Sequence, residues 1–165
     1  MNDDAKIRHQ PGHFERIRNK YPDRHEFPSF TIHLQPNHPE AEASLKAMGF
    51  NVIVGDSTYA SNGFLAGTPE SRAADLMKMF ANKDVRCILP TRGGVGVAAI
   101  LPFLNFPIIK ANPKIISGYS DITVLLNVLY EYADLVTFHS LMLLDFNNRT
   151  PAYNFNQFFS ATSAT

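Results

Sequence analysis

Short apolar runs alternate with stretches of helical spacing along most of this chain. The runs are rich in Val, Ile, Leu and Phe, which is typical of buried strands, and Gly, Pro and Asn stand between them. They lie at residues 30–34, 50–54, 85–89, 114–117 and 135–138. Strands that alternate with helices predict βαβ units, so we expect an α/β fold with an open, mostly parallel sheet and helices on both faces.

The intervening helices are visible from their apolar faces and their ends. Residues 40–48 and 121–132 have apolar positions at helical spacing. Thr68 is placed to cap a third helix, because a proline follows it at the first helical position. A fourth helix is predicted to open in a glycine turn and to run over residues 93–101.

Regular patterning stops on both sides of this region. Residues 1–28 show no sustained period and contain three prolines, so we expect a poorly structured extension. The α/β domain is predicted to occupy residues 29–145. Residues 146–165 are rich in Asn, Thr, Ser, Ala and Phe without a period. We interpret them as a linker or as the truncated start of a missing C-terminal domain.

Charge and hydrophobicity exclude some classes of partner. Fifteen Lys and Arg residues balance 15 Asp and Glu residues, so no net field attracts nucleic acid or an anionic membrane, and we expect neither as a partner. No apolar run is long enough to span a bilayer. The first thirty residues lack the apolar core of a signal peptide, which predicts a cytoplasmic protein.

The cysteine and histidine residues predict neither an internal disulfide nor a metal site. One cysteine, Cys87, excludes an internal disulfide, and its apolar neighbours predict a buried thiol. The histidines do not have the spacing of metal ligands, so we expect no metal site.

Three turns follow predicted strands and are expected to meet at one edge of the sheet. They are residues 92–96, 118–121 and 137–139. In an open parallel sheet, ligands bind beyond the carboxyl ends of the strands. The sequence therefore places the candidate site where these three turns converge.

Ser120 stands at the apex of a strand-turn-helix and has two interpretations. Such a turn can present a serine hydroxyl above the sheet as a nucleophile, and Gly118 would permit the sharp approach. The pattern G-x-S-x-G is only half present, because Ile122 occupies the second glycine position. Alternatively, Ser120 caps the following helix. His139, at the end of the last strand, is a candidate base for Ser120 or a structural residue.

The glycine turn after the third strand also has more than one interpretation. Backbone amides at Gly93 and Gly94 could stabilise a developing oxyanion. Residues 94–99 also fit the dinucleotide-binding pattern G-x-G-x-x-A, with Asp121 as a possible ribose ligand. A third interpretation is that the glycines serve only a tight turn.

Seven segments of the chain, in the same order, match the characteristic sequence of one protein family. They are residues 63–68, 72–76, 91–96, 101–104, 112–114, 118–123 and 135–139. Together they resemble the LD-carboxypeptidase family of serine peptidases, which includes muropeptide carboxypeptidases and microcin C self-immunity peptidases. The agreement extends over roughly residues 30–158, more than any short motif could provide.

The resemblance implies a hydrolase that removes a carboxy-terminal D-amino acid from an L-centre, with a peptide or muropeptide as substrate. Ser120 would be the nucleophile, and the amides of Asp121, Gly94 and Gly93 would stabilise the oxyanion. Family members need no cofactor and are commonly homodimers. Arg92 and His139 are our further candidates for contacting the substrate.

The chain also departs from the family. The family's glutamate and histidine partners of the serine come from a carboxy-terminal domain that has no match here. Ser140 and Leu141 replace the usual glycine and proline, and Asn105 replaces a common aspartate. We therefore predict that this chain alone hydrolyses little or nothing. The alternatives are a catalytically dead remnant that binds a peptide or partner protein, and a dinucleotide-binding domain.

Overall fold

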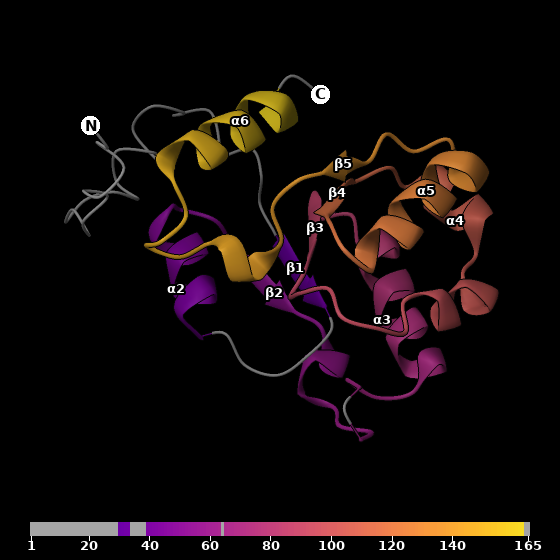
Figure 1. Ribbon diagram of the computed structural model, residues 1–165. Helices are drawn as coiled ribbons and strands as arrows, with labels where there is room; N and C mark the ends of the chain where they lie inside the picture. The colour runs from indigo at the N-terminus through magenta and orange to yellow at the C-terminus, as the bar shows by residue number, and fades with distance from the viewer. Residues whose placement is uncertain (1–29, 34–38, 64, 164–165) are drawn as a thin grey trace.

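The computed structural model describes residues 30–33, 39–63 and 65–163, and these form an alternating series of strands and helices (Figure 1). In chain order the elements are β1 (Phe30–His33), α2 (Pro39–Ala47), β2 (Val52–Val54), η2 (Asp56–Tyr59), α3 (Pro69–Ala81), β3 (Cys87–Pro90), η3 (Ala98–Phe103), α4 (Phe106–Ala111), β4 (Ile115–Gly118), α5 (Ile122–Ala133), β5 (Phe138–His139), η4 (Leu143–Asp145) and α6 (Ala152–Ser163), where η marks a 3-10 helix. The predicted extension at residues 1–28 lies outside the described residues.

One parallel sheet organises the described part of the chain. Its five strands are ordered β2-β1-β3-β4-β5, and all four neighbouring pairs are parallel. The α/β prediction is therefore confirmed. Because the strands run the same way, the turns that leave β3, β4 and β5 all lie at the carboxyl edge of the sheet.

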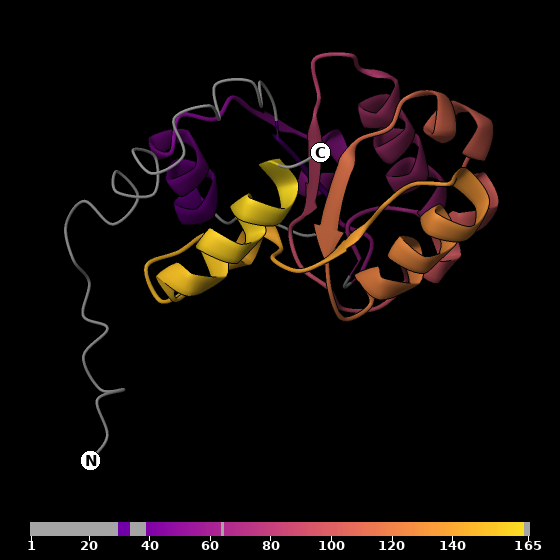
Figure 2. The same ribbon diagram turned by 90° about the horizontal axis from the view of Figure 1, so that it is seen from above.

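Side chains of the sheet alternate between two apolar layers. In β3, Cys87 and Leu89 join one buried cluster, whereas Ile88 between them joins the other. Figure 2 shows α2 and α6 on one side of the sheet and α3, α4 and α5 on the other. Cys87 is buried, as predicted, and burial raises the pKa of its thiol well above the usual range.

Helix α3 begins as the sequence predicts. The Thr68 hydroxyl oxygen accepts a hydrogen bond from the Ser71 amide at 3.2 Å, and a proline occupies the first turn. The buried face includes Ala73, Leu76 and Phe80. This face packs on the sheet within the larger apolar cluster.

Two predicted elements are wrong in their extent. Residues 93–97 are not helical, because Gly94 and Gly96 have φ values of 136° and 97°, which a right-handed helix does not allow. A 3-10 helix begins only at Ala98. The last strand contains Phe138 and His139 rather than residues 135–138, since the amide of Leu135 instead bonds the carbonyl of Leu129 and closes the end of α5.

Two α-helices of the described residues were not predicted, and α6 is the more instructive. Its Phe155, Phe158 and Phe159 are buried and have helical spacing, within a segment that otherwise contains many polar residues. The rings of Phe155 and Phe159 lie 5.4 Å from Phe146 and 5.8 Å from Phe50 respectively, measured between centroids. No regular period was apparent in this segment, and α6 was therefore not predicted. The assignment of residues 146–165 to a linker or to the truncated start of a missing C-terminal domain stays a prediction. Helix α4 was the other omission.

No helix in the described ranges combines the length and apolarity needed to cross a membrane. The same residues contain no group of three or more His, Cys, Asp or Glu side chains arranged to hold a metal ion.

We predict that Phe155→Ala lowers the free energy of unfolding by about 3–5 kcal/mol, because it leaves a cavity in the aromatic cluster that fixes α6. Tyr153→Ala, on the same helix but 68% exposed, is the matched control and should change stability by less than about 0.5 kcal/mol. Urea unfolding followed by circular dichroism measures both. Equal effects at the two positions would mean that α6 is not packed as described.

Candidate active site

Ser120 occupies a strained turn between β4 and α5. Its φ is +60°, in the left-handed region that costs a residue other than glycine about 1 kcal/mol or more. Its carbonyl accepts a hydrogen bond from the Thr123 amide at 3.0 Å, which starts the helix. The side chain is exposed, and its hydroxyl makes no hydrogen bond with any described residue. The serine therefore does not cap α5 through its side chain.

Ile122 stands where a second glycine is usual in this kind of turn, and the structure explains how it fits. Its side chain is fully buried beneath the turn, in the larger apolar cluster. A methyl group placed on Gly118 would lie only 2.6 Å from Ile122 Cγ2. Gly118 therefore leaves the space that Ile122 fills, and the departure from G-x-S-x-G lies on the core side, away from the Ser120 hydroxyl.

The glycine turn after β3 lies directly against the Ser120 turn. A methyl group on Gly93 would be 2.8 Å from Ser120 Cβ, 3.0 Å from its Oγ and 3.5 Å from the Asp121 amide nitrogen. Only glycine permits this approach. Within the described part of the chain, no acceptor is found for the amides of Gly93, Gly94 or Asp121. These N–H groups are thus available for a bound anion beside the hydroxyl.

The Asp121 side chain fastens the two turns together. Its Oδ2 accepts a hydrogen bond from the Val97 amide at 3.0 Å. The carboxylate is therefore directed toward the glycine turn. This arrangement does not suit a dinucleotide, since the ribose ligand is engaged and no α-helix begins at residues 94–97 to receive a pyrophosphate.

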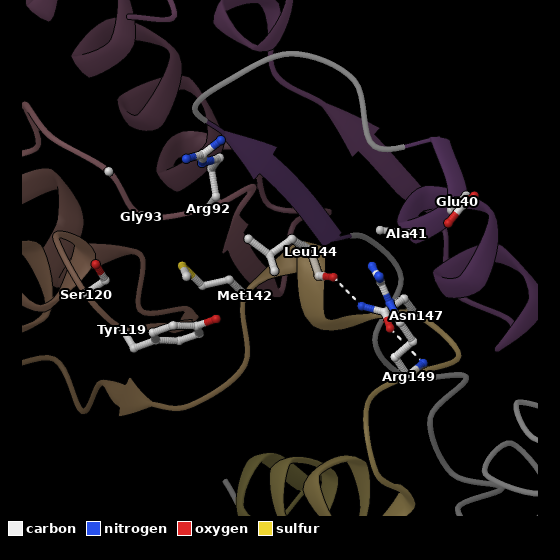
Figure 3. Close-up of a pocket in the computed structure, with 11 residues that line it drawn as sticks. Glu40, Ala41, Arg92, Gly93, Tyr119, Ser120, Met142, Leu144, Asn147 and Arg149 are labelled. Carbon is white, nitrogen blue, oxygen red and sulfur yellow. Dashed lines mark hydrogen bonds between the residues drawn. The ribbon is translucent and has the colours of Figure 1, made fainter. Parts of the chain in front are cut away.

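A pocket of about 690 Å³ opens beside Ser120, which is large enough for a short peptide. It is lined by Glu40, Ala41, Arg92, Gly93, Gly94, Tyr119, Ser120, Met142, Leu144, Asn147 and Arg149. Figure 3 shows Ser120 and Gly93 toward one end and Glu40 and Arg149 toward the other. Arg92, next to Gly93, contributes a positive charge to the lining of the same pocket.

Tyr119 forms part of the pocket wall and is held by Asp145. Its hydroxyl donates to Asp145 Oδ1 at 3.2 Å, while Asp145 Oδ2 accepts from the Met142 amide at 2.8 Å. Burial and the negative charge of Asp145 raise the pKa of the Tyr119 phenol above its ordinary value. Tyr119 is therefore a neutral donor at neutral pH, and each oxygen of Asp145 already accepts a hydrogen bond.

The six residues singled out from the sequence divide into two groups. Ser120, Gly93, Gly94 and Arg92 line one pocket, and Asp121 contributes its amide beside them. His139 pairs with Gly118 in the sheet and is exposed, but it is not among the residues that line the pocket. No histidine or carboxylate among the described residues bonds the Ser120 hydroxyl.

Sequence reasoning missed the far wall of the pocket. Glu40 and Ala41 come from α2, and Met142, Leu144, Asn147 and Arg149 come from the segment after β5. That segment has no periodic pattern, and only the folded chain brings it across the carboxyl edge of the sheet. Only the order of the strands could have revealed this wall: β5 lies beside β4, so the segment that follows β5 lies near Ser120.

Comparison with known proteins identifies the same region. Residues 27–140 match the LD-carboxypeptidase N-terminal domain. The probable murein peptide carboxypeptidase of Bacillus subtilis is 39% identical over 99 residues, which are 60% of this chain and 31% of that protein. The chain thus spans about a third of the length of the curated relatives it matches.

Solved structures agree with the fold. The microcin C7 self-immunity protein MccF, in its wild-type apo state, has a TM-score of 0.77 and 29% identity, covering 82% of this chain and 44% of that one. A muramoyltetrapeptide carboxypeptidase from Oxalobacter formigenes has a TM-score of 0.70 and 26% identity, covering 81% and 48% of the two chains.

Strain at Ser120 gives a testable consequence. Glycine adopts a positive φ freely, so we predict that Ser120→Gly is more stable than Ser120→Ala by about 1 kcal/mol. At Val124, on the exposed side of α5, the order should reverse, with Val124→Gly less stable than Val124→Ala by about 1 kcal/mol. Urea unfolding of the four variants measures this. The same order at both positions would contradict a left-handed Ser120.

Proposed function

Because the chain belongs to the LD-carboxypeptidase family, we propose that it supplies the nucleophile half of a serine peptidase that releases a carboxy-terminal D-amino acid from L,D-peptides of the muropeptide class. One observation supports this most directly. The Ser120 hydroxyl is held in a left-handed turn, without a hydrogen bond, where Gly93 meets it at the end of a peptide-sized pocket.

In this proposal the Ser120 Oγ attacks the scissile carbonyl, the carbon–nitrogen bond breaks, and an acyl-enzyme forms that water then hydrolyses. The amides of Asp121 and Gly94, with Gly93 beside them, stabilise the negative oxygen of the tetrahedral intermediate. The amino-terminal end of α5 adds a partial positive charge at the same place. Loss of one such donor typically slows acyl transfer about a hundredfold or more.

Arg92 is the proposed contact for the substrate's terminal carboxylate. It lies next to Gly93 and lines the same pocket as Ser120, so its charge is available to a carboxylate bound there. A role for His139 in substrate binding stays a prediction, because other residues form the pocket wall. A cytoplasmic location and a homodimer also stay sequence-based expectations.

A general base is the missing component. The described residues place none against Ser120, and a triad acts as a unit, so the hydroxyl alone has ordinary alcohol reactivity. We propose that the base comes from the part of the relatives that this chain does not match. The same gap supports a second candidate function, in which the pocket binds a peptide without cleaving it.

A chimera tests the proposal. In it, residues 27–140 replace the matching segment of the Bacillus subtilis relative, and release of D-alanine from a murein tetrapeptide is measured. We expect turnover that falls by at least about a hundredfold in Ser120→Ala, whereas Ser61→Ala, on an exposed loop, leaves it unchanged.

The remaining outcomes separate the two functions. A folded chimera whose turnover is unchanged by Ser120→Ala, or that has no turnover, contradicts the peptidase. Tetrapeptide binding by that chimera, measured by calorimetry, would then support the binding function. The isolated 165-residue chain is expected to release no D-alanine above its own Ser120→Ala variant.

A further inference from the structure

Arg72 is a buried charge whose place in the fold is not explained by packing alone. It lies in α3, is only 2% exposed, and is the largest fully buried side chain among the described residues. Its Nε and Nη2 atoms have no hydrogen-bond acceptor in the described part of the chain. Burial of an arginine without full pairing is destabilising unless a nearby negative charge compensates it.

The guanidinium lies beneath the glycine turn. A methyl group on Gly96 would be 3.5 Å from Arg72 Nη2 and 3.6 Å from Nη1. Burial lowers the pKa of Arg72, and the negative charge of Asp121 opposes that effect. Since an arginine stays protonated even so, and Arg72 and Asp121 line one small cavity, a buried positive charge lies near the Asp121 carboxylate without a direct hydrogen bond to it.

Arg72 does not reach the peptide pocket. It lines a separate small cavity together with Arg92, Gly93 and Asp121. This cavity has a volume of about 10 Å³, the space of roughly one water molecule, and cannot admit a substrate group. Any effect of Arg72 on the site must therefore act through its neighbours.

Asp121 is the neighbour that connects Arg72 to the site. Its backbone amide is one proposed oxyanion donor, and its Oδ2 accepts the Val97 amide at 3.0 Å. Val97 closes the glycine turn whose Gly94 amide is the other proposed donor. Asp121 is thus close to the charge of Arg72 on α3 and is hydrogen-bonded to the glycine turn. It connects the two proposed oxyanion donors, its own amide and that of Gly94.

We propose that Arg72 is a positioning residue: its charge orients the Asp121 carboxylate, which holds the glycine turn against the Ser120 turn and so sets the distance between the oxyanion donors. This inference rests on the proposed function for its catalytic consequence, but its structural part can be tested alone. A misplacement of about 1 Å in such a site can slow catalysis about a hundredfold.

Hydrogen exchange at the Val97 amide, measured by NMR on the chain itself, tests the structural part. Arg72→Met keeps most of the length and removes the charge, and should speed Val97 exchange by about tenfold or more. Arg72→Lys restores the charge and should recover part of the protection. Asp121→Asn should act like Arg72→Met, and the double variant should add little, because both disturb the same link.

Leu76→Ala, on the same helix and buried to a similar degree, is the matched control. It should lower global stability while leaving the exchange of Val97 relative to Leu129 unchanged. If Arg72→Met behaves as Leu76→Ala does, or if Arg72→Lys gives no recovery, Arg72 only fills space and the inference is wrong.

The catalytic part uses the chimera. Arg72→Met should lower kcat about tenfold or more and leave KM within about twofold, because the oxyanion donors act mainly in the transition state. A rise in KM at constant kcat would overturn the positioning role. A chimera that is inactive throughout contradicts the proposed function, whereas the Val97 exchange data still decide the role of Arg72.

Discussion

The left-handed turn at Ser120 is the constraint on which the rest of the site depends. Such a backbone can be held in place only where its neighbours leave no alternative, and two glycines provide this. Gly118 leaves room for Ile122 below the turn, and Gly93 allows the neighbouring loop to touch Ser120 above it. The serine is therefore clamped between the core and the adjacent turn, with its hydroxyl exposed.

The order of the strands in the sheet brings together the turns that hold Ser120 in place. Because β4 lies between β3 and β5, the turns after all three strands meet at one edge, and the segment after β5 crosses it to form the far wall of the pocket. Asp121 connects two of these turns through Val97, and Arg72 places a buried charge behind that contact. Apolar packing builds the sheet, while these polar groups set the relative position of its turns.

Local sequence pattern predicted most of the strands and helices, because hydrophobic periodicity and helix capping depend on residues that are close in the sequence, as for Thr68 and α3. It could not predict α6, whose three phenylalanines have meaning only against Phe50 and Phe146. It also left Ser120 undecided between cap and nucleophile, because a positive φ at a serine is imposed by distant glycines. Arg149, Tyr119 and Arg72 were missed because their roles depend on contacts that are remote in the sequence.

The central claim is that the free amides of the two turns and the amino-terminal end of α5 form a site for negative charge beside the Ser120 side chain, independently of any general base. Ser120→Cys tests it, with the thiol pKa read from the pH dependence of iodoacetamide alkylation. Cys87 stays silent because it is buried, and Ser61→Cys on an exposed loop gives the reference. The free amides and the helix terminus predict a thiol pKa at position 120 clearly below that at position 61. A pKa equal to or above the reference would contradict the account.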